Sequence, residues 1–166
     1  MSKKPVTNVV IAGLGGQGVL KASDILSEAA FNCGLDVKKS ELHGMSQRGG
    51  SVTSDVRFGD SVASPMVPVG EADYLVVLSV SEIDFSRPLL RQDGGVLLSA
   101  ELIDESQLAN RRSLNVAMLG ALSSFLEIPE DNWHQAIRSN LPEKLHQVNI
   151  EAFNTGREAQ QSQSHT

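Results

Sequence analysis

Ten residues close to the amino end, Val9–Gly18, restrict the fold more than any other stretch of the chain. Val9–Ala12 is a short apolar run that ends in glycine, a pattern typical of a strand buried in a parallel sheet. The glycines that follow have the G-x-G-x-x-G spacing found where a strand turns into a helix, and they let backbone amides approach an anion or another chain. The candidate site residues of this loop are Gly13, Gly15, Gly16, Gln17 and Gly18.

A second glycine-rich stretch, Ser40–Ser51, carries the most distinctive polar side chains of the chain. It reads Ser-Glu-Leu-His-Gly-Met-Ser-Gln-Arg-Gly-Gly-Ser. We expect this loop to lie near the first glycine loop in space, so that the two form one site. Its candidate site residues are His43, Gly44, Gln47, Arg48, Gly49 and Gly50.

The rest of the chain alternates short apolar runs with amphipathic segments. The pattern predicts further strands at Leu35–Leu42, Ser51–Phe58, Tyr74–Ser79 and Val96–Ser99. It predicts helices at Gln17–Asn32, Ser81–Gln92, Asn115–Leu126 and Pro129–Asn140, and a last one from Pro142 to about Glu158. Ser64–Gly70 contains two prolines and is predicted to be an extended edge or a loop, and Glu101–Ser113 a loop with weak helical character.

This order of elements predicts an α/β fold, a three-layer α/β/α sandwich around a mixed, mainly parallel sheet. We expect a single domain over residues 1–158, because the chain is too short for two cores of ordinary size. Leu35–Leu42 is expected to complete the first half of a parallel, right-handed βαβ unit with the first strand. Residues 159–166 are polar and are predicted to form a disordered tail.

Composition excludes several classes of function. A formal charge of -6 argues against a general nucleic-acid binder, which needs a positive surface. The single cysteine, Cys33, cannot form an internal disulfide or hold a zinc ion or iron–sulfur cluster, so we expect no metal site and a small buried hydrophobe instead. The apolar run near the amino end is too short for a signal peptide or a membrane span, so a cytoplasmic protein is expected.

The first glycine loop alone leaves three roles open. A dinucleotide-binding domain normally has an acidic residue about 20 residues further on, to hold the ribose hydroxyls. The matching stretch here offers Lys38 and Lys39, which suit a phosphorylated ribose better, and Glu41 comes late. Binding of NAD(P) or FAD is therefore weakly supported, whereas binding of another anion and a structural or subunit-contact role remain possible.

Taken together, the two loops resemble a specific family. Gly-Leu-Gly-Gly-Gln-Gly-Val at 13–19 and Glu-Leu-His-Gly-Met-Ser-Gln-Arg-Gly-Gly-Ser-Val at 41–52 resemble the gamma-type subunit of the 2-oxoacid:ferredoxin oxidoreductases. His43-Gly44-Met45 is most similar to the beta (small) subunit of the indolepyruvate:ferredoxin branch, since the pyruvate and 2-oxoglutarate branches tend to carry Tyr-Gly-Pro. Asn149-x-x-Ala-Phe-x-x-Gly156 also resembles the carboxyl-terminal helix of the family.

The resemblance implies a subunit of an enzyme that oxidatively decarboxylates a 2-oxo acid to an acyl-coenzyme A and reduces ferredoxin. Thiamine diphosphate, Mg²⁺ and [4Fe-4S] clusters would be carried by a large partner subunit, so this chain alone would be inactive and would belong to a homo- or hetero-oligomer. It has no thiamine-type Gly-Asp-Gly motif. Compared with the family, residues 100–113 form a shortened segment. The alternative is a free-standing nucleotide- or anion-binding regulatory module that uses the Gly13–Gly18 loop.

Two polar side chains of the second loop each have two interpretations. Arg48 is suited to a bidentate pair with a carboxylate or phosphate of a substrate, or to an inter-subunit salt bridge that braces the loop. His43 is suited to binding substrate or relaying a proton, or to a hydrogen bond with local backbone. Ser46 and Ser51 lack an acid–histidine arrangement, so no nucleophilic or other catalytic residue is assigned.

Overall fold

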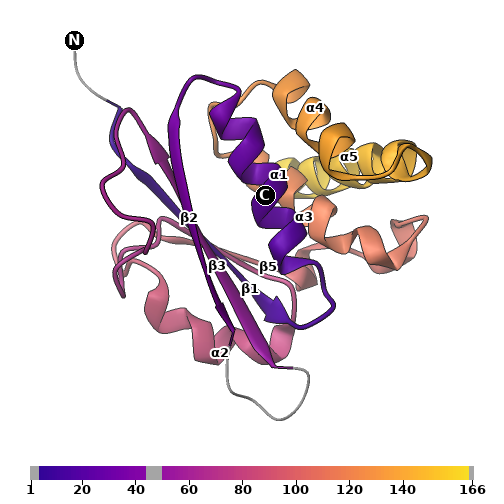
Figure 1. Cartoon of the computed structure of the whole chain (residues 1–166). Helices are drawn as coiled ribbons and strands as arrows, with labels where there is room; N and C mark the ends of the chain where they lie inside the picture. Colours follow the sequence, from indigo (N-terminus) through magenta and orange to yellow (C-terminus); the bar gives the residue numbers. More distant parts are fainter. Residues whose placement is uncertain (1–3, 44–49, 165–166) are drawn as a thin grey trace.

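The computed structural model describes residues 4–43 and 50–164. They form a single α/β domain around a five-stranded mixed sheet, as predicted (Figure 1). The strands are β1 (Thr7–Leu14), β2 (Asp36–His43), β3 (Ser51–Gly59), β4 (Tyr74–Val77) and β5 (Val96–Ser99). The α-helices are α1 (Val19–Phe31), α2 (Ile83–Ser86), α3 (Leu114–Ser123), α4 (Glu130–Asn140) and α5 (His146–Gln163).

The sheet has the strand order β2-β3-β1-β4-β5. β1 pairs in parallel with β4, and β4 with β5, whereas β3 runs antiparallel to both of its neighbours. Only the half of the sheet from β1 to β5 therefore has parallel pairing, so the sheet is mixed as predicted but is not mainly parallel. Burial alternates along β3 as predicted, with Val52, Ser54, Val56 and Phe58 buried.

The predicted βαβ unit is wrong in one respect. β2 has the same direction as β1, but it pairs with β3 and not with β1. Residues 44–50 are too few for a parallel crossover, which needs a dozen or more residues, so β3 must fold back antiparallel to β2. β3 then pairs with β1 along its whole length, from Leu14 opposite Ser51 to Thr7 opposite Phe58.

Each face of the sheet has its own core. Val9 and Ile11 of β1 face the main core, which also contains buried residues of α1, α3, α4 and α5. Val10 and Ala12 face a smaller second core with Leu75, Val77 and Val67. Figure 1 shows the four longer helices on one side of the sheet and α2, in pink, at the other side. The second face is thus covered mainly by the parts of the segment 61–90 that precede and follow β4.

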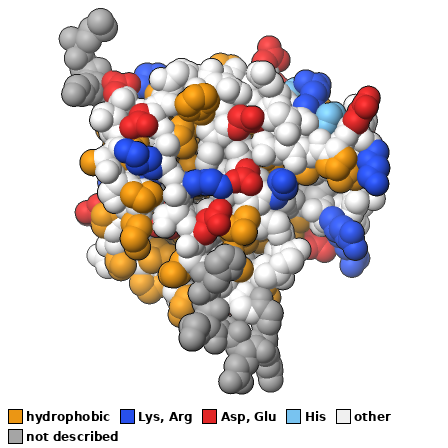
Figure 2. Space-filling model, in the orientation of Figure 1, with side chains coloured by type: hydrophobic (Ala, Val, Ile, Leu, Met, Phe, Trp, Pro, Cys, Tyr) orange, Lys and Arg blue, Asp and Glu red, His pale blue; other side chains and the backbone are white. Residues whose placement is uncertain are grey.

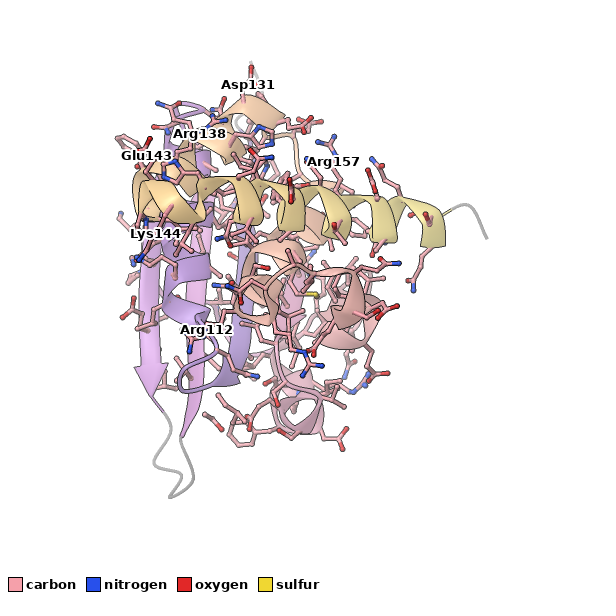
Figure 3. The ribbon with its side chains drawn as sticks, turned by 90° about the vertical axis from the view of Figure 1, so that its right-hand side faces the viewer. Arg112, Asp131, Arg138, Glu143, Lys144 and Arg157 are labelled. Atoms are coloured by element: carbon pink, nitrogen blue, oxygen red, sulfur yellow. The ribbon has the colours of Figure 1, made fainter. Side chains whose placement is uncertain are left out.

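α3 and α5 approach each other closely because each has a glycine at the crossing. A Cβ atom on Gly156 of α5 would overlap the backbone carbonyl of Ala117 in α3, and one on Gly120 would overlap that of Phe153. Arg157 lies next to Gly156 and binds Glu130 of α4 at 3.3 Å, on the side of the molecule that Figure 3 shows. The crossing therefore fixes α5 against both neighbouring helices.

The end of α5 differs from the prediction. A helix end near Glu158 and a disordered tail from Ala159 are predicted, but the helix continues to Gln163. Ala159 is partly buried and packs against the main core, which gives the last turns an apolar contact. Residues 159–163 are therefore helical and do not belong to a disordered tail.

We expect Gly156→Ala to lower the free energy of unfolding by about 1–3 kcal/mol, the usual cost of overpacking. At an exposed position inside a helix, replacing glycine by alanine raises the free energy of unfolding by about 0.5–1 kcal/mol. A lower free energy of unfolding for Gly156→Ala would therefore identify the close contact with Ala117. Gln161→Ala, at an exposed position of the same helix, is the control and should change stability little. Urea unfolding followed by circular dichroism measures both, and a Gly156→Ala variant as stable as the parent would contradict the close packing.

Candidate functional site

The first glycine loop is a tight turn between β1 and α1 that is closed by the side chain of Gln17. The backbone N–H of Leu14 donates to Gln17 Oε1 at 2.7 Å, and Gln17 Nε2 donates to the carbonyl oxygen of Leu78 at 3.4 Å. Gly13 is buried beneath this side chain. Gln17 therefore braces the turn and ties it to the end of β4.

A second amide holds the other end of the turn. Gly18, the residue before α1, is in the left-handed conformation with φ 82°. Asn115 of α3 donates from Nδ2 to the Gly18 carbonyl oxygen at 3.1 Å, and its Oδ1 accepts the N–H of Val116 at 2.9 Å. Sequence analysis missed Asn115. The available signal was a lone amide side chain inside the apolar run from Leu114 to Leu122.

The described end of the second glycine loop lies beside the first loop. The N–H of Gly15 donates to the carbonyl oxygen of Gly50 at 3.0 Å, and Leu14 lies opposite Ser51 in the β1–β3 register. His43 is the last residue of β2, opposite Val52 of β3. Of the remaining predicted site residues, Gly44, Gln47, Arg48 and Gly49 lie outside the described residues.

Ser51 and Glu82 form a further link at this edge of the sheet. The Ser51 hydroxyl donates to Glu82 Oε2 at 2.8 Å and so joins the start of β3 to the short 3-10 helix Val80–Glu82. The hydroxyl is bonded to a carboxylate and not to a histidine, an arrangement that supplies no proton relay for a nucleophile. Glu82 is the second residue that sequence analysis missed, and nothing in its local sequence indicates the contact.

The backbone amides of the first loop are largely used within the protein. The N–H groups of Leu14, Gly15 and Gln17 all donate to protein oxygen atoms. The first turn of α1 has no acidic residue and no side-chain cap, so no side chain of that turn offsets the positive end of the helix. The lysines proposed for a phosphorylated ribose bind elsewhere: Lys38 donates to the Val62 carbonyl and Lys39 forms an ion pair with Asp24. This geometry favours a packing or contact role over dinucleotide binding.

The residues that the structure describes contain no group of three or more His, Cys, Asp or Glu side chains placed to hold a metal ion. Cys33 is partly exposed, not buried as expected, and its sulfur accepts a hydrogen bond from Asn132 at 3.2 Å. Burial raises the pKa of the Cys33 thiol, against the smaller opposing effects of Asn132 and Lys4. The thiol is therefore protonated at neutral pH and is a poor metal ligand. None of the described helices is both long enough and apolar enough to cross a membrane.

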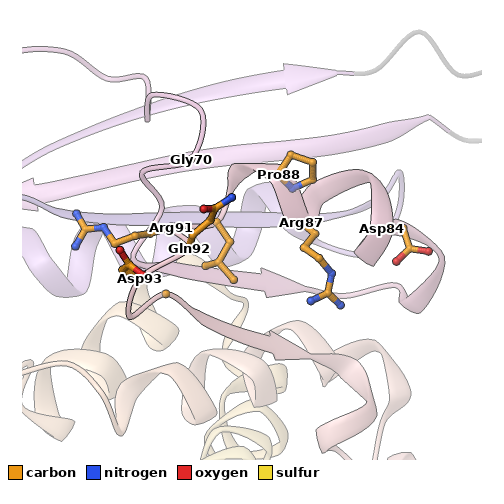
Figure 4. A pocket seen from close by; sticks show the side chains of 9 residues that line it. Gly70, Asp84, Arg87, Pro88, Arg91, Gln92 and Asp93 are labelled. Carbon is orange, nitrogen blue, oxygen red and sulfur yellow. The ribbon is translucent and has the colours of Figure 1, made fainter.

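A hollow of about 1050 Å³ lies at the other end of the sheet, next to the chain segments that precede β4 and β5. Its charged lining residues are Asp84, Arg87, Arg91 and Asp93. Arg91 is paired with Asp73 at 3.1 Å, and in Figure 4 the guanidinium groups of Arg87 and Arg91 point in different directions. These cations do not converge on one point, so the hollow provides no focused anion site.

The comparison with known proteins decides which family these loops belong to. The family profile described as "Pyruvate ferredoxin/flavodoxin oxidoreductase" matches residues 8–106 and 99–159. The chain belongs to this family. It is a gamma-type subunit of a 2-oxoacid:ferredoxin oxidoreductase, as the resemblance of the two loops indicates.

Three relatives match most of this chain, but the match covers different shares of the relatives themselves. It is 32% identical to indolepyruvate oxidoreductase subunit IorB of Methanothermobacter thermautotrophicus, over 90% of this chain and 95% of the relative, and 35% identical to IorB of Thermococcus kodakarensis, over 90% and 93%. Ketoisovalerate oxidoreductase subunit VorA of Methanothermobacter marburgensis is 29% identical over 89% of this chain, but this covers only 35% of VorA.

Two solved structures share the fold. The gamma subunit of a keto/oxoacid ferredoxin oxidoreductase from Geobacter sulfurreducens has a TM-score of 0.72 and 22% identity, with 94% of this chain and 99% of that chain covered. The 2-oxoglutarate:ferredoxin oxidoreductase from Magnetococcus marinus has a TM-score of 0.79 and 19% identity, with 98% of this chain but 32% of that chain covered. The fold of the subunit therefore occurs both as a separate chain and as one part of a longer one.

We predict that Gly18→Ala destabilises the subunit more than Gly16→Ala. Both glycines have a positive φ, 82° and 87°, so both variants carry the left-handed cost of about 1–2 kcal/mol. An added Cβ at Gly16 meets nothing within 4 Å, whereas one at Gly18 overlaps Asn115 Nδ2. Displacing Asn115 should cost about a further 0.5–1.5 kcal/mol, the net worth of its hydrogen bond.

Thermal and urea unfolding of both variants measure this difference. A Gly18→Ala/Asn115→Ala double variant tests the cause. Without the Asn115 amide the Cβ at residue 18 has no side chain to displace, so the double variant should lose less stability than the two single variants summed. Equal losses of stability in Gly16→Ala and Gly18→Ala would contradict the proposed lock by Asn115.

Proposed function

We propose that this chain is the small subunit of an oxidoreductase that acts on indolepyruvate or other aryl pyruvates. The reaction is oxidative decarboxylation of the 2-oxo acid to an acyl-coenzyme A, with reduction of ferredoxin. The observation that carries the proposal is the 32–35% identity to IorB subunits over 90% of this chain. The His43-Gly44-Met45 form of the second loop supports the same branch.

The cofactors belong to the large subunit in this proposal. The whole chain has one cysteine, and the described residues offer no metal-ligating cluster, so the chain's side chains do not fit an iron–sulfur cluster. Thiamine diphosphate, Mg²⁺ and [4Fe-4S] clusters are therefore assigned to the large partner subunit. We assign the present chain the role of completing the assembly at the substrate or coenzyme A entrance.

The paired loops are proposed as the part of this chain that meets the large subunit near its active site. Both loops end at the same edge of the sheet, where Gly15 is bonded to Gly50. The backbone N–H groups of Leu14 and Gly15 donate to oxygen atoms of this chain and are therefore not free to bind a phosphate, which supports a contact role for the loop. Arg48 lies between Gln47 and Gly49 in the sequence that connects β2 to β3, and its guanidinium is suited to orient an anionic group.

The second candidate function is a free-standing anion-binding module. It is favoured by one observation, the uncapped amino end of α1 with no acidic residue in its first turn. Calorimetry on the isolated chain separates the two functions, because a subunit of the proposed kind binds no NAD(H) at micromolar concentration. Tight binding of NAD(H), with no large subunit recovered from the native host, would favour the module.

We predict that the chain alone is colourless and inactive and that activity appears only with the large subunit. Reconstituted enzyme should reduce ferredoxin with indolepyruvate at a kcat/KM at least about tenfold above that with pyruvate or 2-oxoglutarate, a difference of about 1.4 kcal/mol. Stopped-flow or steady-state assays with the three acids at saturating coenzyme A measure this ratio. A preference for pyruvate would place the enzyme in another branch, and stoichiometric iron and sulfide on the isolated chain would contradict the cofactor assignment.

We predict that Arg48→Ala in the reconstituted complex raises the activation or binding free energy by about 1.5–3 kcal/mol, the usual worth of a hydrogen bond to a charged group. Activity and subunit affinity are measured separately. Lower kcat/KM with intact assembly supports contact with substrate or coenzyme A, whereas lost assembly alone supports a brace between subunits. Arg138→Ala, at an exposed position of α4, is the control. If Arg48→Ala changes neither quantity, the loop has no role in the enzyme.

A further inference from the structure

Large apolar side chains are exposed on one side of the domain. Among the described residues, the exposed ones are Phe31, Leu42, Met66, Val69, Val80 and Phe85. All except Phe31 belong to the end of β2 or to the segment 61–90. Figure 2 shows hydrophobic side chains gathered at the lower left, where Figure 1 places α2 and the end of β2. This side of the molecule carries the apolar surface that the domain leaves uncovered.

Three contacts place these residues on the side of the second core. Lys38 shares a face of β2 with Leu42 and donates to the Val62 carbonyl of the covering segment. Asp55 of β3 accepts the N–H of Val67 at 2.9 Å, and Arg57 donates to the Met66 carbonyl at 3.2 Å. The second core therefore lies under this segment, and Leu42 and Met66 stand beside it.

α2 adds an exposed aromatic ring on the same side. Ile83 packs against the second core, whereas Phe85 is 74% exposed. We define the apolar face as Leu42, Met66, Val69 and Phe85, whose side chains are between 61% and 76% exposed. Exposed apolar side chains that gather on one face of a protein mark interaction sites.

The longer relatives indicate what covers this face. In VorA the matching region makes up 35% of the chain, and in the Magnetococcus marinus structure the matching fold makes up 32%. In these two proteins the matching domain is therefore covalently continuous with the rest of a longer chain. In IorB of Methanothermobacter thermautotrophicus the matching region makes up 95% of the chain. A subunit of that kind contacts its partner through a surface that buries on the order of 800 Å² per partner.

We propose that the apolar face is the surface with which this chain docks on the large subunit of its oxidoreductase. The proposal rests on the proposed function. The face reaches the end of β2, where Leu42 directly precedes His43. The Ser51–Glu82 hydrogen bond holds the helix Val80–Glu82, which leads into α2, beside the start of β3. Charged groups of both signs, Lys38, Asp84 and Arg87, lie near it and form the polar rim that protein interfaces have.

The experiment uses the full chain and the large subunit of the same enzyme. Phe85→Glu and Leu42→Glu place a charge on the face at exposed positions, so both variants should fold, which circular dichroism and thermal unfolding verify. Phe31→Glu is the matched control, since Phe31 is 66% exposed but belongs to α1 on the other side of the sheet. Biolayer interferometry should show affinity for the large subunit at least tenfold weaker for Phe85→Glu and Leu42→Glu, and within threefold of the parent for Phe31→Glu.

Three outcomes overturn the proposal. If the parent complex forms and is active while Phe85→Glu and Leu42→Glu bind as tightly as the parent, the proposed function stands and the docking surface is wrong. If Phe31→Glu weakens binding as much as Phe85→Glu, the effect is not specific to the face. If light scattering shows a dimer of this chain that Phe85→Glu separates, with binding to the large subunit unchanged, the face joins two copies of the chain instead.

Discussion

Two side-chain amides hold the turn between β1 and α1, and both glycine loops depend on them. A turn this tight leaves backbone groups without regular partners, and buried groups of that kind are costly unless they are hydrogen-bonded. Gln17 accepts the Leu14 N–H and reaches Leu78 after β4, while Asn115 reaches the Gly18 carbonyl from α3. One turn thereby joins two neighbouring strands and two helices.

The second loop takes its position from the same turn. β3 pairs with β1 up to Leu14 opposite Ser51, and the Gly15–Gly50 hydrogen bond continues that contact into the loop. β2 pairs with β3 up to His43, so both ends of the segment 44–49 are fixed by the sheet.

The glycine pattern serves packing here, although in sequence it is typical of a nucleotide site. The difference lies in what fills the space above the turn. In a phosphate-binding loop the amides face the ligand, whereas here Gln17 and Gly50 accept them. Of the two lysines that suited a phosphorylated ribose, Lys38 donates to the Val62 carbonyl and Lys39 is paired with Asp24 of α1. Family membership shows that this chain is a subunit of a 2-oxoacid:ferredoxin oxidoreductase.

Local patterns in the sequence determined the elements and the family. The apolar run Val9–Ala12, the alternation along Ser51–Phe58 and the proline at 129 were sufficient to predict β1, β3 and the start of α4, because burial on one face and capping are local properties. The paired loop motifs were sufficient for the family, although part of the second motif, 44–49, lies outside the described residues. The strand order, the Asn115 and Glu82 contacts and the apolar face were decided only by the tertiary structure. Each depends on residues far apart in the chain, such as Gly18 and Asn115, and strand order follows from which hydrogen-bonding edges meet in three dimensions.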